Sequence, residues 1–318
     1  MKRLFTFLLS FSLIILAQGQ DLAQLFPNSD KDQASLPVLG TFNSSRIING
    51  QSNETVHKND LLFVVMHRFG DIAGNSGGIQ TLYGLDNSTD ILIGFDYGIS
   101  DHWSIGIGRA KGSPNGISTN QRELVYLNSK FRIVRQSTDN RIPLSVSFFG
   151  NSVISTMEKS TIATSDASFH SLGDRMSYLA QLIVTRKFSH GLSLAILPTY
   201  IRRNYVSYRD ENNLFALGLG TRVKISSGMA IIADYFIPFR GQNSKDYFLE
   251  QKDFQFHHPL GIGLEIETGG HVFNAIFTNS AAILENQFIP ATSSSWGSGE
   301  FRWGFTITRT FSLARNEP

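Results

Sequence analysis

The chain has 318 residues, including 25 Phe, 28 Gly and no Cys, and its formal net charge is +2. So small a net charge, without Lys/Arg runs, argues against nucleic-acid binding, because no long-range field draws a polyanion to the surface. Only 17% of residues are charged, against about 25% in ordinary soluble domains. The mean hydropathy of −0.08 argues against an α-helical membrane protein, so the composition favours an exported or envelope β protein.

The N-terminus has the pattern of a secretory signal peptide. Two basic residues precede an apolar run from Leu4 to Ala17, and Gly19 completes an A-x-G arrangement of small residues. The run is shorter than the roughly 20 apolar residues that span a bilayer. We therefore expect residues 1–19 to be a signal peptide cleaved before Gln20, which implies export from the cytoplasm.

Residues 20–60 differ from the rest of the chain, because they are polar and lack a clear period. We interpret them as a periplasmic N-terminal segment or linker, a candidate contact for a periplasmic partner. The stretch from residue 41 could also pack into or below the main domain. No later apolar run reaches 18 residues, which excludes a helical membrane protein and leaves a soluble exported β protein or an outer-membrane β-barrel.

From Leu61 onward, apolar residues recur with a period of two, as in strands with one apolar face. In "NLFALGLGTRVKI", Phe215 and Leu217 share one face, and Arg222 and Lys224 share the other. Residues 61–318 are thus expected to form one β domain. Twelve strands are predicted, near residues 61–69, 90–99, 103–110, 121–135, 142–154, 175–188, 192–205, 213–225, 229–239, 254–267, 271–279 and 300–311.

The connections between these strands alternate in length along the chain. Tight turns are expected at 100–102, 137–140, 189–191, 226–228 and 268–270, with longer polar stretches between them. An even number of strands places both ends of the domain on the side of the tight turns. That side is periplasmic in outer-membrane barrels.

A membrane barrel explains the strand faces better than a soluble sandwich. A sandwich would carry charged side chains on its outward face, whereas here one face is almost continuously apolar. Strands of 10–14 residues also suit a tilted bilayer crossing of about 9–11 residues. In hydrocarbon the sheet must close, because no backbone group can be left without a partner. The predicted fold is therefore all-β, an antiparallel up-and-down transmembrane barrel.

The face opposite the apolar one carries charges of both signs, which makes it the candidate lumen. Arg222 and Lys224 precede the strand that bears Asp234, so a cross-strand ion pair is expected. A closed interior filled by salt bridges and a narrow pathway for a small polar solute both fit this pattern. The candidate lumen-facing residues are Asp96, Lys130, Arg132, Arg222, Lys224, Asp234, Glu265 and Glu267.

The apolar face has aromatic and basic residues near the strand ends, as in the aromatic girdles at membrane interfaces. "WSIGIGR" and "WGFTITR" share this form, each with a Trp and an Arg at opposite ends of one face. The last strand ends in an aromatic residue, which resembles the signal read by the barrel-assembly machinery. The candidate interface residues are Trp103, Arg109, Trp303, Arg309 and Phe311.

Several longer motifs together resemble a family of Bacteroidota outer-membrane β-barrel proteins that is known as a domain of unknown function, DUF5777. The resemblance implies the barrel and its location but supplies no activity and no catalytic residues. The motifs are "TFNSSRIINGQSNETV" (41–56), "MHRFGDI" (66–72), "GLDNSTDILIGFDYGISDHWSIGIGR" (84–109), "ETGGHVFNAIFTNS" (267–280), "ENQFIPATSSSW" (285–296) and "WGFTITRTFSL" (303–313).

Other chemistry has little support in the sequence. The glycines of "HWSIGIGRAKG" lack the helix that must follow a dinucleotide-binding loop, and we interpret them as the thin inner face of a barrel wall. His257 and His258 are adjacent, so on a strand they point to opposite sides and cannot share a metal. His258 would lie on the lipid face. No cofactor or metal is expected.

The leading hypothesis is an outer-membrane barrel in contact with lipid, acting as a narrow channel or as a structural, partner-binding envelope protein. One alternative is an enzyme acting on lipid, like a phospholipase barrel, although no distinctive Ser/His spacing marks a catalytic pair. The other alternative is a soluble periplasmic β-barrel binding protein.

Overall fold

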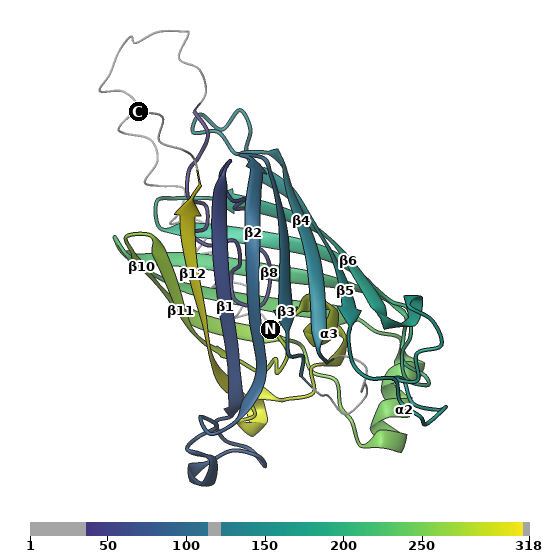
Figure 1. The fold of residues 1–318 in the computed structure, drawn as a ribbon. Helices are drawn as coiled ribbons and strands as arrows, with labels where there is room; N and C mark the ends of the chain where they lie inside the picture. The colour runs from purple at the N-terminus through teal and green to yellow at the C-terminus, as the bar shows by residue number, and fades with distance from the viewer. Residues whose placement is uncertain (1–35, 114–121, 314–318) are drawn as a thin grey trace, which may run out of the picture. The chain divides into compact units, whose positions relative to one another are not determined.

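The computed structural model describes residues 36–113 and 122–313 (Figure 1). The predicted signal peptide, residues 1–19, lies outside them. The described residues from Pro37 onward form one compact unit, so residues 37–59 belong to the same unit as the strands. Twelve antiparallel strands close into a barrel, in which each strand pairs with its neighbours in sequence and the first pairs with the last. The predicted fold class and strand number are confirmed.

The strand bounds agree with the predicted ranges to within a few residues, except at 254–267. There the strand begins only at Leu260, because Pro259 has no N–H for the ladder and Phe254 packs against a helix. The strands are β1 (Asp60–Asp71), β2 (Ser88–Ser100), β3 (Trp103–Ala110), β4 (Leu124–Val134), β5 (Ser145–Ser155), β6 (Met176–Lys187), β7 (Leu192–Arg203), β8 (Asn213–Ser226), β9 (Met229–Phe239), β10 (Leu260–Thr268), β11 (His271–Thr278) and β12 (Arg302–Ser312).

The two ends of the barrel differ in their connections, as expected. We call one the turn end; it holds the short connections 101–102, 188–191, 227–228 and 269–270 and the longer 135–144. The other is the loop end, which lies at the bottom of Figure 1. Its connections are 72–87, 111–123, 156–175, 204–212, 240–259 and 279–301.

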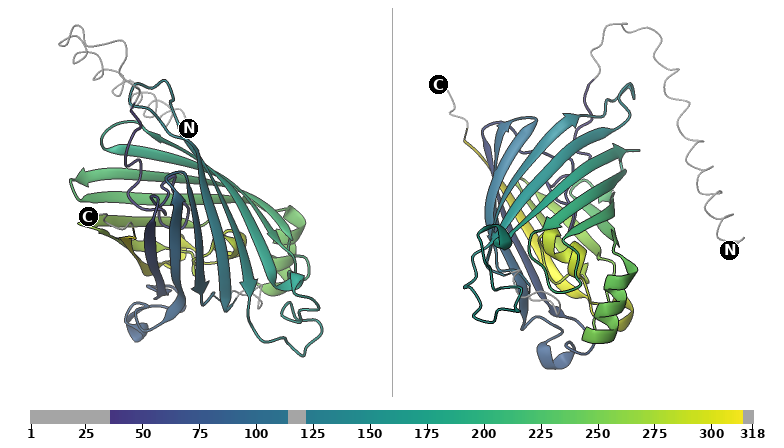
Figure 2. Two further views of the ribbon diagram at one scale, coloured as in Figure 1. Left: turned by 45° about the horizontal axis from the view of Figure 1, so that its top comes forward. Right: turned by 90° about the vertical axis from the view of Figure 1, so that its right-hand side faces the viewer.

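Among the described residues, short helices lie in four of these loop-end connections. They are α2 (Gln242–Lys252), α3 (Glu285–Ala291) and the 3₁₀ helices η1 (Ile79–Thr81), η2 (Gly173–Arg175) and η3 (Trp296–Ser298). In the part of the chain that the structure describes, no helix has the length and hydropathy needed to cross a membrane. All seven residues of α3 are buried, because this helix lies within the ring of strands (Figure 2).

The outward face of the barrel exposes large apolar side chains. Phe215, Leu219 and Val223 point outward from β8, while Leu214 and Ala216 are buried on its inner face. This alternation follows from the period of two, because successive side chains of a strand point to opposite faces. A broad exposed apolar surface of this kind is suited to contact with lipid.

The inner face is covered by two segments of the chain, and the barrel interior is therefore occupied. We call residues 41–56 the inner segment and residues 279–301 the inner loop. Ile47 and Ile48 of the inner segment and Phe288 of the inner loop share one apolar cluster with wall residues such as Leu197 and Phe236. Glycine also makes room for the inner segment on the inner wall: a Cβ at Gly220 would overlap Ile47 Cδ1, so this glycine admits the inner segment.

If the outward face contacts lipid, a charge placed on it should lower the free energy of unfolding, most of all near the middle of a strand. Ile107 lies within β3 and Ile225 one residue before the end of β8, and both side chains are 53% exposed. Ile107→Lys is expected to lower the free energy of unfolding by about 2–4 kcal/mol, and Ile225→Lys by only about 0–1 kcal/mol, because the cost falls toward the interface. Urea titration in phospholipid vesicles measures both. Equal losses would contradict the assignment of this face to lipid.

Candidate functional site: the occupied lumen

The centre of the lumen holds a tight hairpin of the inner segment. Residues 45–52, which we call the inner hairpin, bring Arg46 opposite Gln51 in an antiparallel bridge. The N–H of Ile47 donates to the carbonyl of Gly50 at 2.8 Å, and that of Ser52 donates to Ser45 at 3.0 Å. The turn contains an Asn-Gly pair, which is a common hairpin sequence. The hairpin thus presents its tip to the barrel wall.

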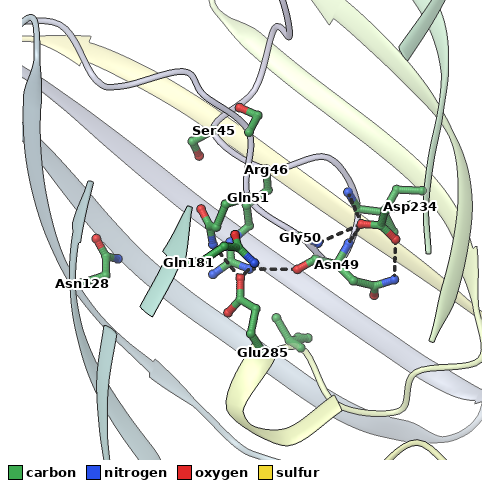
Figure 3. A network of polar contacts seen from close by, with 12 residues as sticks. Ser45, Arg46, Asn49, Gly50, Gln51, Asn128, Gln181, Asp234 and Glu285 are labelled. Carbon is green, nitrogen blue, oxygen red and sulfur yellow. Dashed lines mark hydrogen bonds and ion pairs between the residues drawn. The ribbon is translucent and has the colours of Figure 1, made fainter. Parts of the chain in front are cut away.

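Asp234 on β9 binds this tip. Its Oδ2 accepts the backbone N–H groups of Ile48 (3.2 Å), Asn49 (2.6 Å) and Gly50 (2.8 Å). Its Oδ1 accepts the side-chain amide of Asn49 at 2.8 Å (Figure 3). Three successive N–H groups directed at one anion form a nest, which stabilises the negative charge with backbone dipoles. Asp234 is buried, so these bonds satisfy a carboxylate that water does not solvate.

Lys130 on β4 satisfies the carbonyl groups of the inner segment. Its ammonium donates to the carbonyl oxygens of Ser45 (2.7 Å), Ser52 (3.0 Å) and Glu54 (3.2 Å). Arg132, two residues along β4, pairs with Glu54 at 3.7 Å. Asp234 on β9 therefore binds backbone N–H groups of the inner segment, and Lys130 on β4 binds backbone carbonyl groups of the same segment.

An ion pair joins the inner hairpin to the inner loop. Arg46 Nη1 lies 3.0 Å from Glu285 Oε1, and Gln51 Nε2 donates to the same oxygen at 2.7 Å (Figure 3). Glu285 is the first residue of α3 and is fully buried. Asp90 on β2 holds the loop from another side, since it accepts the N–H of Ile283 at 2.9 Å. The two segments in the lumen are thus bound to each other as well as to the wall.

The expected ion pair of Arg222 or Lys224 with Asp234 does not form. The ladder places Gly220 opposite Asp234, and Arg222 instead reaches Glu265 on β10 at 2.8 Å. Lys224 lies nearer the turn end, where its Nζ is 3.3 Å from His190 Nε2.

The other two predicted lumen residues contact polar neighbours. Asp96 Oδ1 accepts the side-chain amide of Asn128 at 2.9 Å. Glu267 is exposed at the turn end, where its Oε2 accepts the amide of Asn43 at 2.8 Å. The eight candidates therefore do not form one network. They divide between contacts to the inner segment and contacts within the wall.

The five candidate interface residues lie on the outward face, near strand ends. Trp103 begins β3 at the turn end and Arg109 is near its loop end; Trp303 and Arg309 occupy the reverse ends of β12. Trp103 Nε1 donates to Ser129 Oγ at 2.9 Å, and the Arg309 guanidinium lies 4.8 Å from the Phe311 ring centroid. These positions place an aromatic and a basic side chain at each end of the apolar face.

The histidines form no cluster. His257 and His258 lie in the connection before β10 and not in a strand, so the predicted strand position of His258 is wrong. His258 Nδ1 instead lies 2.6 Å from the hydroxyl of Tyr235. Within residues 36–113 and 122–313, no group of three or more metal-ligating side chains comes together.

At the loop end a second buried charge cluster holds three connections together. Asp210 lies 2.9 Å from Arg203 Nη1 and 2.6 Å from Arg240 Nη1. Arg240 also donates to the carbonyl of Pro290 in α3 at 2.8 Å. Burial acts to raise the pKa of the Asp210 carboxyl, but the two guanidinium groups outweigh it and the pKa lies below its ordinary value.

Cavities remain at both ends of the occupied lumen. The loop-end vestibule has a volume of about 380 Å³ and is lined by residues such as Lys111, Gln287 and Arg302. The turn-end vestibule has a volume of about 260 Å³ and is lined by residues such as Ser45, Glu54 and Glu267. The inner hairpin and α3 lie between the two.

Arg46, Asn49 and Glu285 were not predicted as lumen residues. Both motifs that contain them, residues 41–56 and 285–296, were noted for their resemblance to a family, but neither has a strand period. The Asn-Gly pair marks a turn, yet nothing local shows that this turn lies inside a barrel.

The model of a family described as a membrane-bound beta barrel domain, DUF5777, matches residues 42–311. The chain belongs to this family. The match begins at Phe42, so the DUF5777 domain includes the inner segment as well as the strands. No curated protein matches the sequence.

Solved barrels resemble the DUF5777 domain only distantly. The KdgM porin shares 6% identity at a TM-score of 0.46, with 79% of this chain and 99% of that chain covered. An outer membrane channel from Pseudomonas putida F1, COG4313, shares 11% identity at a TM-score of 0.48, with coverage of 81% and 98%. LpxR from Salmonella typhimurium shares 11% identity at a TM-score of 0.33, with coverage of 79% and 99%. Similarities this distant carry no argument about solute or activity.

The nest around Asp234 predicts a large effect of one substitution. Asp234→Asn keeps the size of the side chain but removes the charge that the three N–H groups bind. We expect a loss of roughly 3 kcal/mol in unfolding free energy, since hydrogen bonds to charged groups are the strong ones. Hydrogen exchange at residues 48–50 should accelerate. Exposed Asp86→Asn is the matched control, and exchange no faster than in that control would refute the role of Asp234.

The Asp210 cluster predicts a pH dependence of the loop end. Because the folded-state pKa lies below the ordinary value of about 3.9, the cluster stabilises the loops fully above that pH and loses this effect as the pH falls through the folded pKa. Acid-active protease should therefore cut residues 204–212 and 240–259 only below about pH 4. Asp210→Asn should be cut at higher pH as well, whereas Asp246→Asn on α2 should behave as the wild type.

Proposed function

We propose that this protein is an outer-membrane channel of low conductance for small polar solutes. The observation that carries the proposal is the pair of vestibules, about 380 and 260 Å³, at opposite ends of one lumen. What separates them is the inner hairpin and α3, which hydrogen bonds and an ion pair hold against the wall. Contacts of this kind can be broken and remade, unlike the closed ladder of the strands.

The orientation follows from the connections. The turn end faces the periplasm and the loop end faces outward, as in outer-membrane barrels of known orientation. Residues 1–19 serve as the signal peptide for export. The predicted contact for a periplasmic partner, residues 20–60, narrows to residues 20–40, because residues 41–56 lie in the lumen. Phe311, near the end of β12, is part of the sequence that the assembly machinery reads. We also propose that the protein comes from the Bacteroidota, because its motifs resemble barrels of that group.

A sealed structural barrel is the second candidate, and the apolar cluster in the lumen favours it. That cluster joins the inner segment, the inner loop and strands β5–β9 and β11. An enzyme acting on lipid is not proposed, because His258 bonds to the Tyr235 hydroxyl and not to a serine. A soluble periplasmic binder does not fit the exposed apolar face.

Planar-bilayer recording separates the channel from the sealed barrel. We expect the wild type to give steps well below those of general porins, because the lumen is occupied. Asp234→Asn should give larger or longer steps, since the tip of the inner hairpin is released from β9. Asp86→Asn should match the wild type. If neither the wild type nor Asp234→Asn gives current steps, in preparations shown to be folded by heat-modifiable mobility, the barrel is sealed.

A further inference from the structure

Besides the vestibules, the barrel holds two small cavities, and residues of β4 and β5 contribute to the lining of both. The first, of about 20 Å³, is lined by Ser45 and Glu54 of the inner segment and by Asn128 and Phe149 of the wall. The second, also about 20 Å³, is lined by Val153 of β5, Leu124 of β4 and Asn286 of α3, among others. Each can hold a water molecule, which needs about 10–15 Å³.

These cavities share lining residues with the vestibules. Ser45, Glu54 and Val56 line both the first small cavity and the turn-end vestibule. Gln287 lines both the second small cavity and the loop-end vestibule. The first small cavity therefore adjoins the turn-end vestibule, and the second adjoins the loop-end vestibule.

Asn151 occupies the interval between the two small cavities. On the inner face of β5 it lies between Phe149, which lines the first, and Val153, which lines the second. Directly across the ladder it faces Asn128. The side chain of Asn151 is buried, yet neither its Nδ2 nor its Oδ1 has a hydrogen-bond partner among the residues that the structure describes.

Other unpartnered polar atoms lie on this side as well. Among the described residues, both amide atoms of Asn53, Oε1 of Gln181 and Oε2 of Glu285 lack hydrogen-bond partners, although all three side chains are buried. Ser147 on β5 donates to the carbonyl of Asn53, and Gln181 lies beside β5 on β6, so these groups face the same part of the lumen. Buried amides without partners are costly, and a hydrogen-bonding solute satisfies them.

Apart from Asp234, which binds the tip, the opposite side of the inner hairpin is apolar and closely packed. Gly50 approaches Leu197 and Phe236 so closely that a Cβ would lie 2.9 and 2.8 Å from their side chains. Ile47 fits over Gly220 in the same way. A path along β7–β9 would have to break this apolar packing, whereas a path along β4 and β5 would not.

We propose that a narrow polar path runs between the inner hairpin and strands β4 and β5, with Asn151 as its narrowest and selecting residue. It takes water and small uncharged solutes that hydrogen-bond, such as short polyols, because the unpartnered groups along it are mainly amides. The nearby charges are already engaged: Lys130 binds three carbonyls and Arg46 binds Glu285. This inference rests on the proposed channel function and names its route.

Osmotic swelling of proteoliposomes in glycerol tests the route. Asn151→Ala widens the interval, so glycerol uptake should rise several-fold above that of the wild type. Asn151→Leu closes it with an apolar side chain of similar size, so uptake should fall toward that of protein-free vesicles. Leu197→Ala is the matched control, because it removes a larger side chain on the apolar side of the same hairpin and should leave uptake unchanged.

The outcomes separate the route from the channel itself. If wild-type vesicles take up glycerol no faster than protein-free vesicles, the proposed function fails and the route fails with it. If the wild type conducts glycerol but Leu197→Ala raises uptake as much as Asn151→Ala, the route along β4 and β5 is wrong. The same conclusion follows if Asn151→Leu leaves uptake unchanged. Heat-modifiable mobility of each variant shows that the barrel has folded.

Discussion

Closure of a twelve-strand ladder is the constraint on which the rest of this structure depends. In lipid every backbone N–H and C=O needs a partner, so β1 must pair with β12. Closure then sends every second side chain inward. An eight-strand barrel is just filled by its own side chains, and a wider one is not. In a twelve-strand barrel with glycine at Gly218, Gly220 and Gly261 of the inner wall, the chain itself supplies the missing volume.

That filling brings backbone into the lumen, and backbone must also be hydrogen-bonded. The inner hairpin satisfies part of this demand within its own turn, and the wall satisfies more of it through two charged side chains. Asp234 accepts three N–H groups, and Lys130 donates to three carbonyls. Buried charges are costly unless they are paired and hydrogen-bonded. The charges of the inner wall therefore position the inner segment more than they bind one another.

The lumen is consequently asymmetric. Toward β7–β9 the inner hairpin packs on apolar side chains and glycine, with Asp234 as the polar contact of its tip, and toward β4–β6 it faces amides and small cavities. The apolar side fixes the hairpin in place, whereas the polar side with its unpartnered groups carries the proposed solute path. A barrel built this way can be stable and still conduct, because the two requirements are met by different walls.

The sequence by itself determined the barrel. Its period of two, its alternating short and long connections and its apolar strand faces are local properties, and they predicted twelve strands with nearly correct bounds. Only the stretch before β10 was wrong, because "FQFHHP" alternates like a strand although Pro259 and the helix α2 prevent pairing there. The alternation of side chains along each strand also identified Lys130 and Asp234 as inward-facing.

Tertiary structure alone decided what those side chains bind. Asp234 and Asn49 are far apart in the chain, and no local pattern relates a residue of the barrel wall to the turn of the inner hairpin. Which residues face one another across a lumen depends on strand register and on the volume left after closure. Both are properties of the whole barrel, and for that reason the occupied lumen and its polar side could not be read from any one stretch.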